Sequence, residues 1–201
     1  MALAHLWQAN LEWEPQLAPV QSLCYEERTA LRGQLDHKLN TPLTSSIGRL
    51  FDAAAALIGV RQVVTYESQA AIEMEALADP SEQGYYEFEI SLSQFDPQPV
   101  FEGLVRDWLS GTPVPVLSAR FHNSVAHVAL HLCQRVHTSQ GIHTVALSGG
   151  VWQNMFLLQK TVNFLKGAGF EVLLHRQTPA NDGCIALGQA AVAAVTSFVE
   201  V

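Results

Sequence analysis

A glycine pair near the C-terminal end of the 201-residue chain has the composition of an anion-binding turn. Gly149 and Gly150 follow the apolar run 144–147, which predicts a short buried strand, and precede a helical pattern that contains Asn154. Glycine lets the backbone approach an anion closely, and the N–H groups that open a helix point at it. Asn154, one turn into the pattern, could hydrogen-bond a sugar or phosphate oxygen. A tight strand-to-helix turn without a ligand accounts equally well for the two glycines.

A second candidate is Asp182, in the turn Asn181-Asp182-Gly183 that opens a final apolar helical pattern. A carboxylate there is either a helix N-cap or a ligand to a hard cation or a metal-bridged phosphate, and for an isolated aspartate the cap is the commoner use. The topology favours a ligand, because both turns flank one strand–helix–strand unit and ligands of open α/β sheets bind at the carboxyl ends of strands. Asp52, inside another predicted helix, is either a solvated dipole partner or a group for ribose hydroxyls.

Three histidines share one predicted helix without completing a metal motif. His127 and His131 lie four residues apart on one face, which is the spacing of two zinc ligands. Apolar residues stand between them, so the acid of an HExxH motif is missing, and we interpret the pair as surface or interface histidines. His122 lies in the first turns of the helix and is the better site candidate.

Hydrophobic periodicity predicts the elements that must position these residues. The segment 47–59 is the clearest helix, because it contains consecutive alanines and ends at a glycine. The last two strands, with the helix between them, predict a βαβ unit with a parallel crossover. We divide the chain into a mainly helical part with one strand, 1–112, and a C-terminal lobe with the βαβ unit, 113–201. Helices are expected at 22–37, 47–59, 69–78, 100–109, 117–137, 153–166 and 185–199, and strands at 85–90, 144–147 and 170–174.

Composition excludes several classes of function. The chain carries 11 Lys and Arg against 19 Asp and Glu, a net charge of −8, which argues against nucleic acid as a partner. No apolar run approaches the roughly 18–20 residues that cross a bilayer, and we see no signal peptide, so we expect no membrane association. Cys24, Cys133 and Cys184 form no metal-binding pair and suit the reduced thiols of a cytoplasmic protein.

Five ordered segments resemble the HypF family of carbamoyltransferases, which act in nickel–iron hydrogenase maturation. The resemblance covers nearly the whole chain, and five blocks in order are far more specific than any one alone. It corresponds to the later part of the TsaD-like domain of that family. It implies the α/β fold of actin, sugar kinases and related ATPases, with a mixed sheet flanked by helices. The segments are NTPLTSSIGRLFD at 40–52, YESQAAIE at 66–73, RFH at 120–122, SGGVWQN at 148–154 and PANDG at 179–183.

The resemblance also implies a reaction. In this family an upstream YrdC-like domain makes carbamoyl-adenylate from carbamoyl phosphate and ATP. The TsaD-like domain then passes the carbamoyl group to the C-terminal cysteine of HypE, where it becomes the cyanide ligand of the hydrogenase. HypE and the upstream HypF domains are therefore the expected partners, and the chain by itself is expected to be inactive.

Matching motifs carry the roles of the family's residues to this chain. Asp52 would hold the nucleotide ribose, and Gly149, Gly150 and Asn154 would line the nucleotide. Asp182 would bind a divalent metal, whose two histidine ligands in the family lie upstream of the matched segments.

The chain departs from the family pattern at two positions. Ser68, which we place among the nucleotide-binding residues, stands where the family usually has glycine, and its Cβ can crowd a nucleotide. Cys184 replaces a second glycine after Asp182. Two other functions stay open. One is a TsaD-like tRNA threonylcarbamoyl transferase, which the negative charge disfavours. The other is a non-catalytic nucleotide-binding or interaction module, which the change at Ser68 favours.

Overall fold

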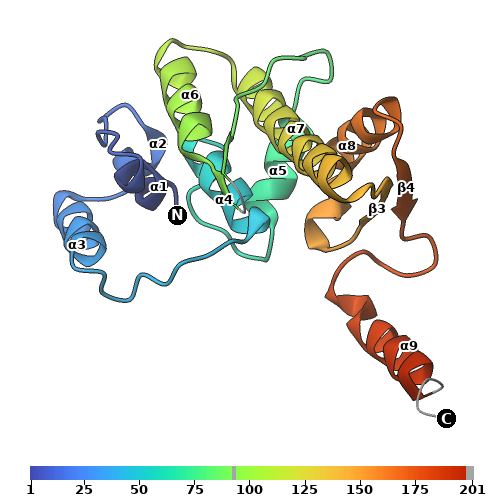
Figure 1. Ribbon diagram of the computed structural model, residues 1–201. Coiled ribbons are helices and arrows are strands. Elements are labelled where there is room, and N and C mark those ends of the chain that lie inside the picture. Colours follow the sequence, from blue (N-terminus) through green and yellow to red (C-terminus); the bar gives the residue numbers. More distant parts are fainter. Residues whose placement is uncertain (92–93, 198–201) are drawn as a thin grey trace. The chain divides into compact units, whose positions relative to one another are not determined.

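The computed structural model describes residues 1–91 and 94–197, and the chain divides into two compact units, Met1–Ala129 and Leu130–Val201. The division falls inside helix α7, later than the 112/113 boundary drawn from the sequence, because the first half of α7 buries its side chains in the first unit. The first unit contains α1 (Ala2–Gln8), α2 (Ala18–Gln21), α3 (Tyr25–Asp36), α4 (Ile47–Leu57), α5 (Gln69–Leu77), β1 (Glu89–Ile90), β2 (Phe95–Asp96), α6 (Gln98–Leu109) and the start of α7 (Val114–Gln140). The second contains the end of α7, β3 (Thr144–Leu147), η1 (Gly150–Gln153), α8 (Met155–Gly167), β4 (Glu171–Leu174), η2 (Asp182–Cys184) and α9 (Ile185–Ser197). Figure 1 labels the α-helices of both units and strands β3 and β4.

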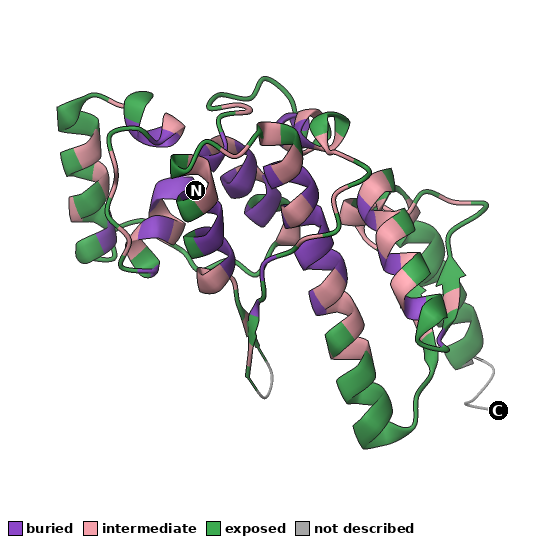
Figure 2. Ribbon diagram, turned by 90° about the horizontal axis from the view of Figure 1, so that it is seen from above, coloured by how far each residue is buried: buried purple, intermediate pink, exposed green. Residues whose placement is uncertain are grey.

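Helix α4 lies in the core of the first unit. The helix expected here is confirmed: the Ser46 side chain accepts a backbone N–H of the first turn at 3.3 Å, and Gly59 follows its end with φ +76. Phe51 packs edge-on against Phe121 of α7, with ring centroids 4.9 Å apart. Figure 2 shows burial running through the first half of α7 and giving way to exposed residues towards its end. This packing fixes the helix that carries Asp52.

The strand expected at 85–90 was wrong for most of its length. Only its last two residues form β1, which pairs antiparallel with β2. Upstream of β1, the N–H of Tyr86 donates to Ser124 Oγ at 2.7 Å, and the Tyr86 ring lies so close to Gly103 that a Cβ there would clash with it. The alternating pattern therefore buries Tyr86 against α6 and α7 and Phe88 against Phe95 of β2, and these two residues form no strand pair of their own.

The βαβ unit of the second unit is confirmed. Strands β3 and β4 pair in parallel, in register from Thr144↔Glu171 to Leu147↔Leu174, with α8 between them in the chain. The α/β class is confirmed too. The described residues contain one antiparallel pair of strands, β1 and β2, and one parallel pair, β3 and β4. The two pairs form separate two-stranded sheets. The small core of this unit consists of Leu147, Leu165 and Phe170.

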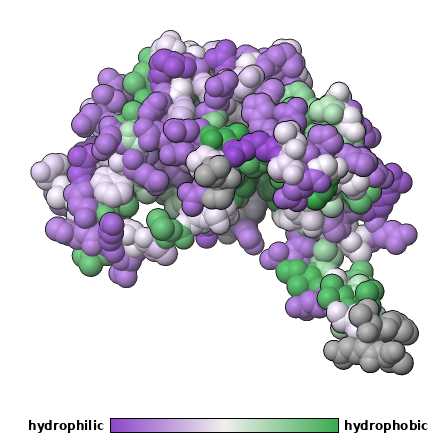
Figure 3. All heavy atoms as spheres, in the orientation of Figure 1, coloured by the Kyte–Doolittle hydropathy of each residue, from purple (hydrophilic) through white to green (hydrophobic). Residues whose placement is uncertain are grey.

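Helix α9 differs from the other helices because residues 185–196 are all exposed. These residues include no Asp, Glu, Lys, Arg or His, and Figure 3 shows apolar surface along this helix. A helix that is apolar on every face is normally buried. Helix α9 thus presents an apolar surface that the described residues leave uncovered. Among those residues, no helix combines the length and the apolar character needed to span a membrane.

Candidate functional site

The turn after β3 is built around Gly149. Its backbone lies at φ 110 and ψ 156, a conformation essentially restricted to glycine. Its N–H donates to the carbonyl oxygen of Ala180 at 2.7 Å, so this amide joins two turns and is not directed at a ligand. A Cβ on Gly149 would meet no described atom within 4 Å. The space beside the turn is open, as an approaching ligand requires.

The second turn lies directly against the first. Asn181, and not Asp182, caps the short helix η2, because Asn181 Oδ1 accepts the N–H of Gly183 at 3.0 Å. A Cβ on Gly150 would lie 4.0 Å from the Cβ of Asn181. The Asp182 side chain is exposed and makes no hydrogen bond within the described part of the chain. The cap that competes with a ligand role is therefore filled by the neighbouring residue.

Asn154 is the N-cap of α8. Its Oδ1 accepts the N–H of Leu157 at 2.8 Å, and the helix expected from residue 153 begins as the separate turn η1 before α8 starts. Because the amide oxygen serves the helix, a sugar or phosphate oxygen would meet the NH₂ group of Asn154. The capping role and a ligand contact therefore use different atoms of the same side chain.

Asp52 and Ser68 belong to the first unit, whereas both turns belong to the second. Asp52 is half-buried on α4, and loss of hydration raises the pKa of its carboxyl while the nearby Arg49 opposes that rise. Ser68 precedes α5 with φ 62, in the left-handed region that favours glycine. The glycine that the resemblance leads us to expect at this position would suit this backbone, and Ser68 holds a strained conformation.

The residues that the structure describes do not by themselves make a metal centre. They contain no group of three or more His, Cys, Asp or Glu side chains that could hold a metal ion. Asp182 alone does not suffice, because stable sites need several ligands. His127 stacks on Tyr85 with ring centroids 3.8 Å apart, and His131 is exposed. This agrees with the interpretation of the histidine pair as surface residues.

His122 is a core residue, which corrects the expectation that it was the best site candidate of the three histidines. It is fully buried, and its Nδ1 lies 2.8 Å from the carbonyl oxygen of Ser118. Its ring centroid lies 5.0 Å from that of Phe51. Burial lowers the pKa of His122 to about 4, so the imidazole is neutral near neutral pH. Its place near the start of α7 reflects packing against α4 and not access to a ligand.

The motif search missed His175. This residue follows β4 directly, as Ser148 follows β3, and the last residues of the two strands are register partners. His175 Nε2 lies 2.9 Å from Ser148 Oγ, and Nδ1 lies 3.1 Å from Thr178 Oγ1. The signal that could have found it is its position at the carboxyl end of the second parallel strand.

Comparison with known proteins assigns this chain to a class. The family model described as "Carbamoyltransferase, Kae1-like Domain, second subdomain" matches residues 1–189. Carbamoyltransferase HypF of Synechocystis sp. is 40% identical over an alignment of 161 residues, and the alignment covers 78% of this chain and 20% of that protein. Carbamoyltransferase HypF of Rhizobium leguminosarum bv. viciae is 37% identical over an alignment of 195 residues, and the alignment covers 96% of this chain and 25% of that protein. The chain belongs to the HypF carbamoyltransferase family.

A solved structure supports the same assignment. The crystal structure of full-length HypF in the phosphate- and nucleotide-bound form superposes with a TM-score of 0.82 and 39% sequence identity. The match covers 87% of this chain and 24% of that one. The chain thus spans between 20% and 25% of the length of the relatives described here.

Proposed function

We propose that this chain forms part of a carbamoyltransferase that passes a carbamoyl group from carbamoyl-adenylate to the C-terminal cysteine of HypE. This transfer serves cyanide ligand synthesis in nickel–iron hydrogenase maturation. The observation that carries the proposal is the hydrogen bond from Gly149 to Ala180, because it joins the turn that the resemblance assigns to the nucleotide to the turn that it assigns to the metal. The phosphate- and nucleotide-bound form of the related HypF supports a nucleotide as a ligand, and we infer that this nucleotide is ATP or carbamoyl-adenylate.

The proposed transfer needs little covalent chemistry from the residues of this chain. Carbamoyl-adenylate is a mixed anhydride with AMP as its leaving group. The cysteine sulfur of the partner attacks the carbamoyl carbon, the bond from that carbon to the AMP oxygen breaks, and the thiol proton passes to solvent. The site has to hold the adenylate in line with the thiolate and stabilise charge on the phosphate with N–H and O–H donors. The Ser148 hydroxyl and the Asn154 side-chain amide are suited to that task, and the open space beside Gly149 leaves room for the phosphate.

A divalent metal belongs to the proposal, but its site is not complete in the described residues. Asp182 is the one ligand that the family resemblance assigns to this chain, and its exposed carboxylate is compatible with that role. The other ligands are proposed to be the upstream histidines of the family, outside the matched segments.

The apolar helix α9 supports the upstream HypF domains as partners. The matching family model describes a second subdomain, so a complete Kae1-like domain also has a first one. Four large apolar side chains of α9 are exposed by 52–66%, and removing such surface from water stabilises an interface by roughly 25 cal/mol per Å². We propose that α9 docks on that first subdomain. The four side chains are Ile185, Leu187, Val192 and Val195.

A chimera tests the proposed function. Residues 1–189 replace the matching segment of the Synechocystis relative, and the native relative serves as the control. We expect the chimera to transfer radiolabelled carbamoyl groups to HypE. Asp182→Ala should abolish that transfer while pyrophosphate release from ATP, which reports adenylate formation, continues. Transfer at the unchanged rate would remove Asp182 from the site, and no transfer by the unmutated chimera would contradict the proposed function.

The strained Ser68 keeps a non-catalytic module as the second candidate. A left-handed serine at a glycine position suits a cleft that has lost its ligand. Calorimetric titration of the chimera with ATP separates the two functions, since a decayed cleft binds no nucleotide. The tRNA-modifying alternative predicts tRNA retention in a filter-binding assay, and the net charge of −8 disfavours it.

A further inference from the structure

A short hydrogen-bonded chain of three side chains lies beside the glycine turn. His175 is its middle member, with Nε2 2.9 Å from Ser148 Oγ and Nδ1 3.1 Å from Thr178 Oγ1. Ser148 immediately precedes Gly149, whose positive φ and open surroundings define the proposed approach of the nucleotide. All three side chains belong to the second unit; Ser148 and His175 directly follow β3 and β4, and Thr178 lies in the loop after β4.

The parallel pairing of the strands makes this contact. Leu147 and Leu174 are register partners at the ends of β3 and β4, so the next residue of each strand, Ser148 and His175, emerges at the same edge. Ligands of open α/β sheets bind at that edge. The contact between Ser148 and His175 is therefore placed by the sheet and not by a flexible loop alone.

Two proton arrangements fit these distances. In one, Thr178 donates to Nδ1 and Nε2–H donates to Ser148 Oγ, which leaves the Ser148 O–H directed outward. In the other, Ser148 donates to Nε2 and Nδ1–H donates to Thr178, so that Ser148 presents only oxygen lone pairs. An anion at the turn is attracted by the first arrangement and repelled by the second. A neutral imidazole has one N–H, and its tautomer therefore decides which face Ser148 shows to a ligand.

We propose that His175, held by Thr178, donates from Nε2–H to Ser148 and so fixes the Ser148 hydroxyl as a donor to the nucleotide phosphate at the Gly149 turn. His175 is a positioning residue, and Ser148 is the residue that contacts the ligand. The inference rests on the proposed function, because it needs a phosphate at this turn. It adds a specificity element for that phosphate, since the ribose and base of the nucleotide have no part in this contact.

Binding of AMP and of adenosine to the chimera tests the proposal. A hydrogen bond to a charged group contributes enough that Ser148→Ala and His175→Ala should each weaken AMP binding roughly tenfold to a hundredfold. Adenosine binding should not change, because adenosine lacks the phosphate. The double variant should bind AMP no more weakly than either single one, since both remove the same contact. His175→Gln, whose amide N–H₂ reaches about the position of Nε2, should retain affinity close to that of the unmutated chimera.

The control is His143→Gln, at an exposed histidine that precedes β3 in the same unit. It should leave the affinity for both ligands unchanged. If AMP binds and His175→Ala binds it as tightly as the control does, the positioning role is wrong while the proposed function stands. If the chimera binds neither AMP nor adenosine, the proposed nucleotide site itself is wrong and the inference falls with it.

A second measurement does not depend on nucleotide binding. Nitrogen NMR of the 201-residue chain, with the His175 signals assigned by their loss in His175→Gln, reports which ring nitrogen carries the proton. We expect Nε2–H, and Thr178→Val should shift that tautomer because it removes the donor to Nδ1. A proton on Nδ1 in the unmutated chain would overturn the proposal.

Discussion

The backbone N–H of Gly149 donates to the carbonyl oxygen of Ala180 across 2.7 Å, and this bond connects the turn after β3 to the turn before η2. Gly150 and Asn181 lie against each other in the same region. The two candidate turns therefore form one continuous surface at the carboxyl ends of the parallel strands. A change that disturbs either partner of this bond should affect both turns.

Gly149→Ala should lower the free energy of unfolding by about 1–3 kcal/mol. The open surroundings exclude a steric clash, so the cost comes from the backbone conformation at φ 110, which alanine adopts poorly. Gly167→Ala is the matched control: Gly167 ends α8, has no positive φ and also has no described atom within 4 Å of its Cβ position. The Gly167→Ala variant should leave the free energy of unfolding unchanged or raise it by up to about 1 kcal/mol. Urea denaturation of the two variants measures this, and equal effects would contradict the backbone argument.

Ser68→Gly should stabilise the chain by about 0.5–1 kcal/mol. Ser68 holds φ 62, which costs an L-residue about 1–2 kcal/mol, and part of the gain is offset by the greater freedom of glycine in the unfolded chain. Ser46→Gly is the control, because Ser46 lies at φ −74 and caps α4. It should lose stability instead. Chemical denaturation measures the free energy of unfolding of both variants. A change in the same direction for both would contradict the strain argument.

The buried His122 predicts a pH-dependent stability. In the unfolded chain a histidine takes up a proton near pH 6.5, whereas in the folded chain the pKa of His122 is lowered to about 4. Its contribution is therefore fully present above about pH 6.5 and is lost as the pH falls towards 4, by about 3 kcal/mol in total. His122→Asn keeps a donor towards the Ser118 carbonyl and removes the titration, so stability should depend less on pH in this window.

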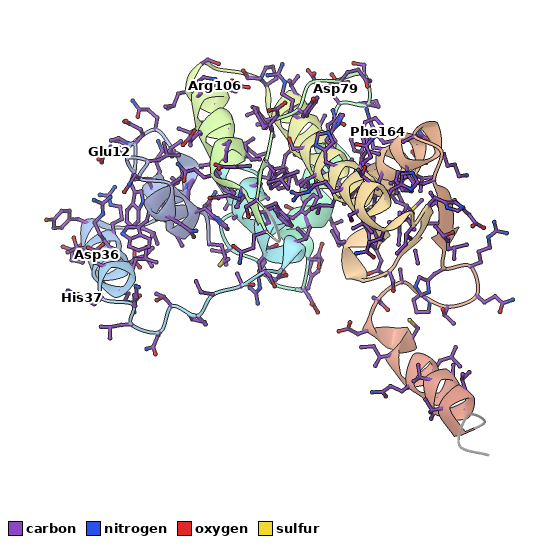
Figure 4. All side chains as sticks on the ribbon, in the orientation of Figure 1. Glu12, Asp36, His37, Asp79, Arg106 and Phe164 are labelled. Atoms are coloured by element: carbon purple, nitrogen blue, oxygen red, sulfur yellow. The ribbon has the colours of Figure 1, made fainter. Side chains whose placement is uncertain are left out.

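The control for this pH dependence is His37→Asn, at an exposed histidine next to the end of α3 (Figure 4). It should keep the slope of the unmutated chain. Denaturation between pH 4 and 8 measures the difference, and an unchanged slope in His122→Asn would show that His122 is not the group responsible.

Negative charges introduced on α9 should have different effects in the 201-residue chain and in the chimera. In the 201-residue chain, Ile185→Glu and Leu187→Glu, both inside the segment carried into the chimera, replace exposed side chains and should change the free energy of unfolding by less than about 0.5 kcal/mol. In the chimera, where we propose that α9 is covered, each should cost about 1–3 kcal/mol. Gln159→Glu, at an exposed position of α8, is the control and should be neutral in both. Neutral α9 variants in the chimera would argue against docking on the first subdomain.

Patterns between near neighbours predicted much of this fold. Helix α4 with its Ser46 cap and the following Gly59 was predictable because caps, propensity and periodicity act over a few residues. The βαβ unit was predictable for the same reason. Its topology indicated both candidate turns, because ligands of open α/β sheets bind at the carboxyl ends of the strands. The ordered motifs also led to the HypF family, which the comparisons confirm.

Contacts between distant segments decided the remainder. Local alternation at 85–90 did not reveal that Tyr86 packs on α6 and α7, and helical spacing did not reveal that His122 is buried against α4. The pairing of Ser148 with His175 depends on the parallel register of two strands that the chain separates by a helix. By itself the sequence determined most of the helices, the βαβ unit, the family and the candidate turns, because these depend on neighbouring residues. Only the tertiary structure decided which side chains meet, because burial and strand register depend on the whole unit.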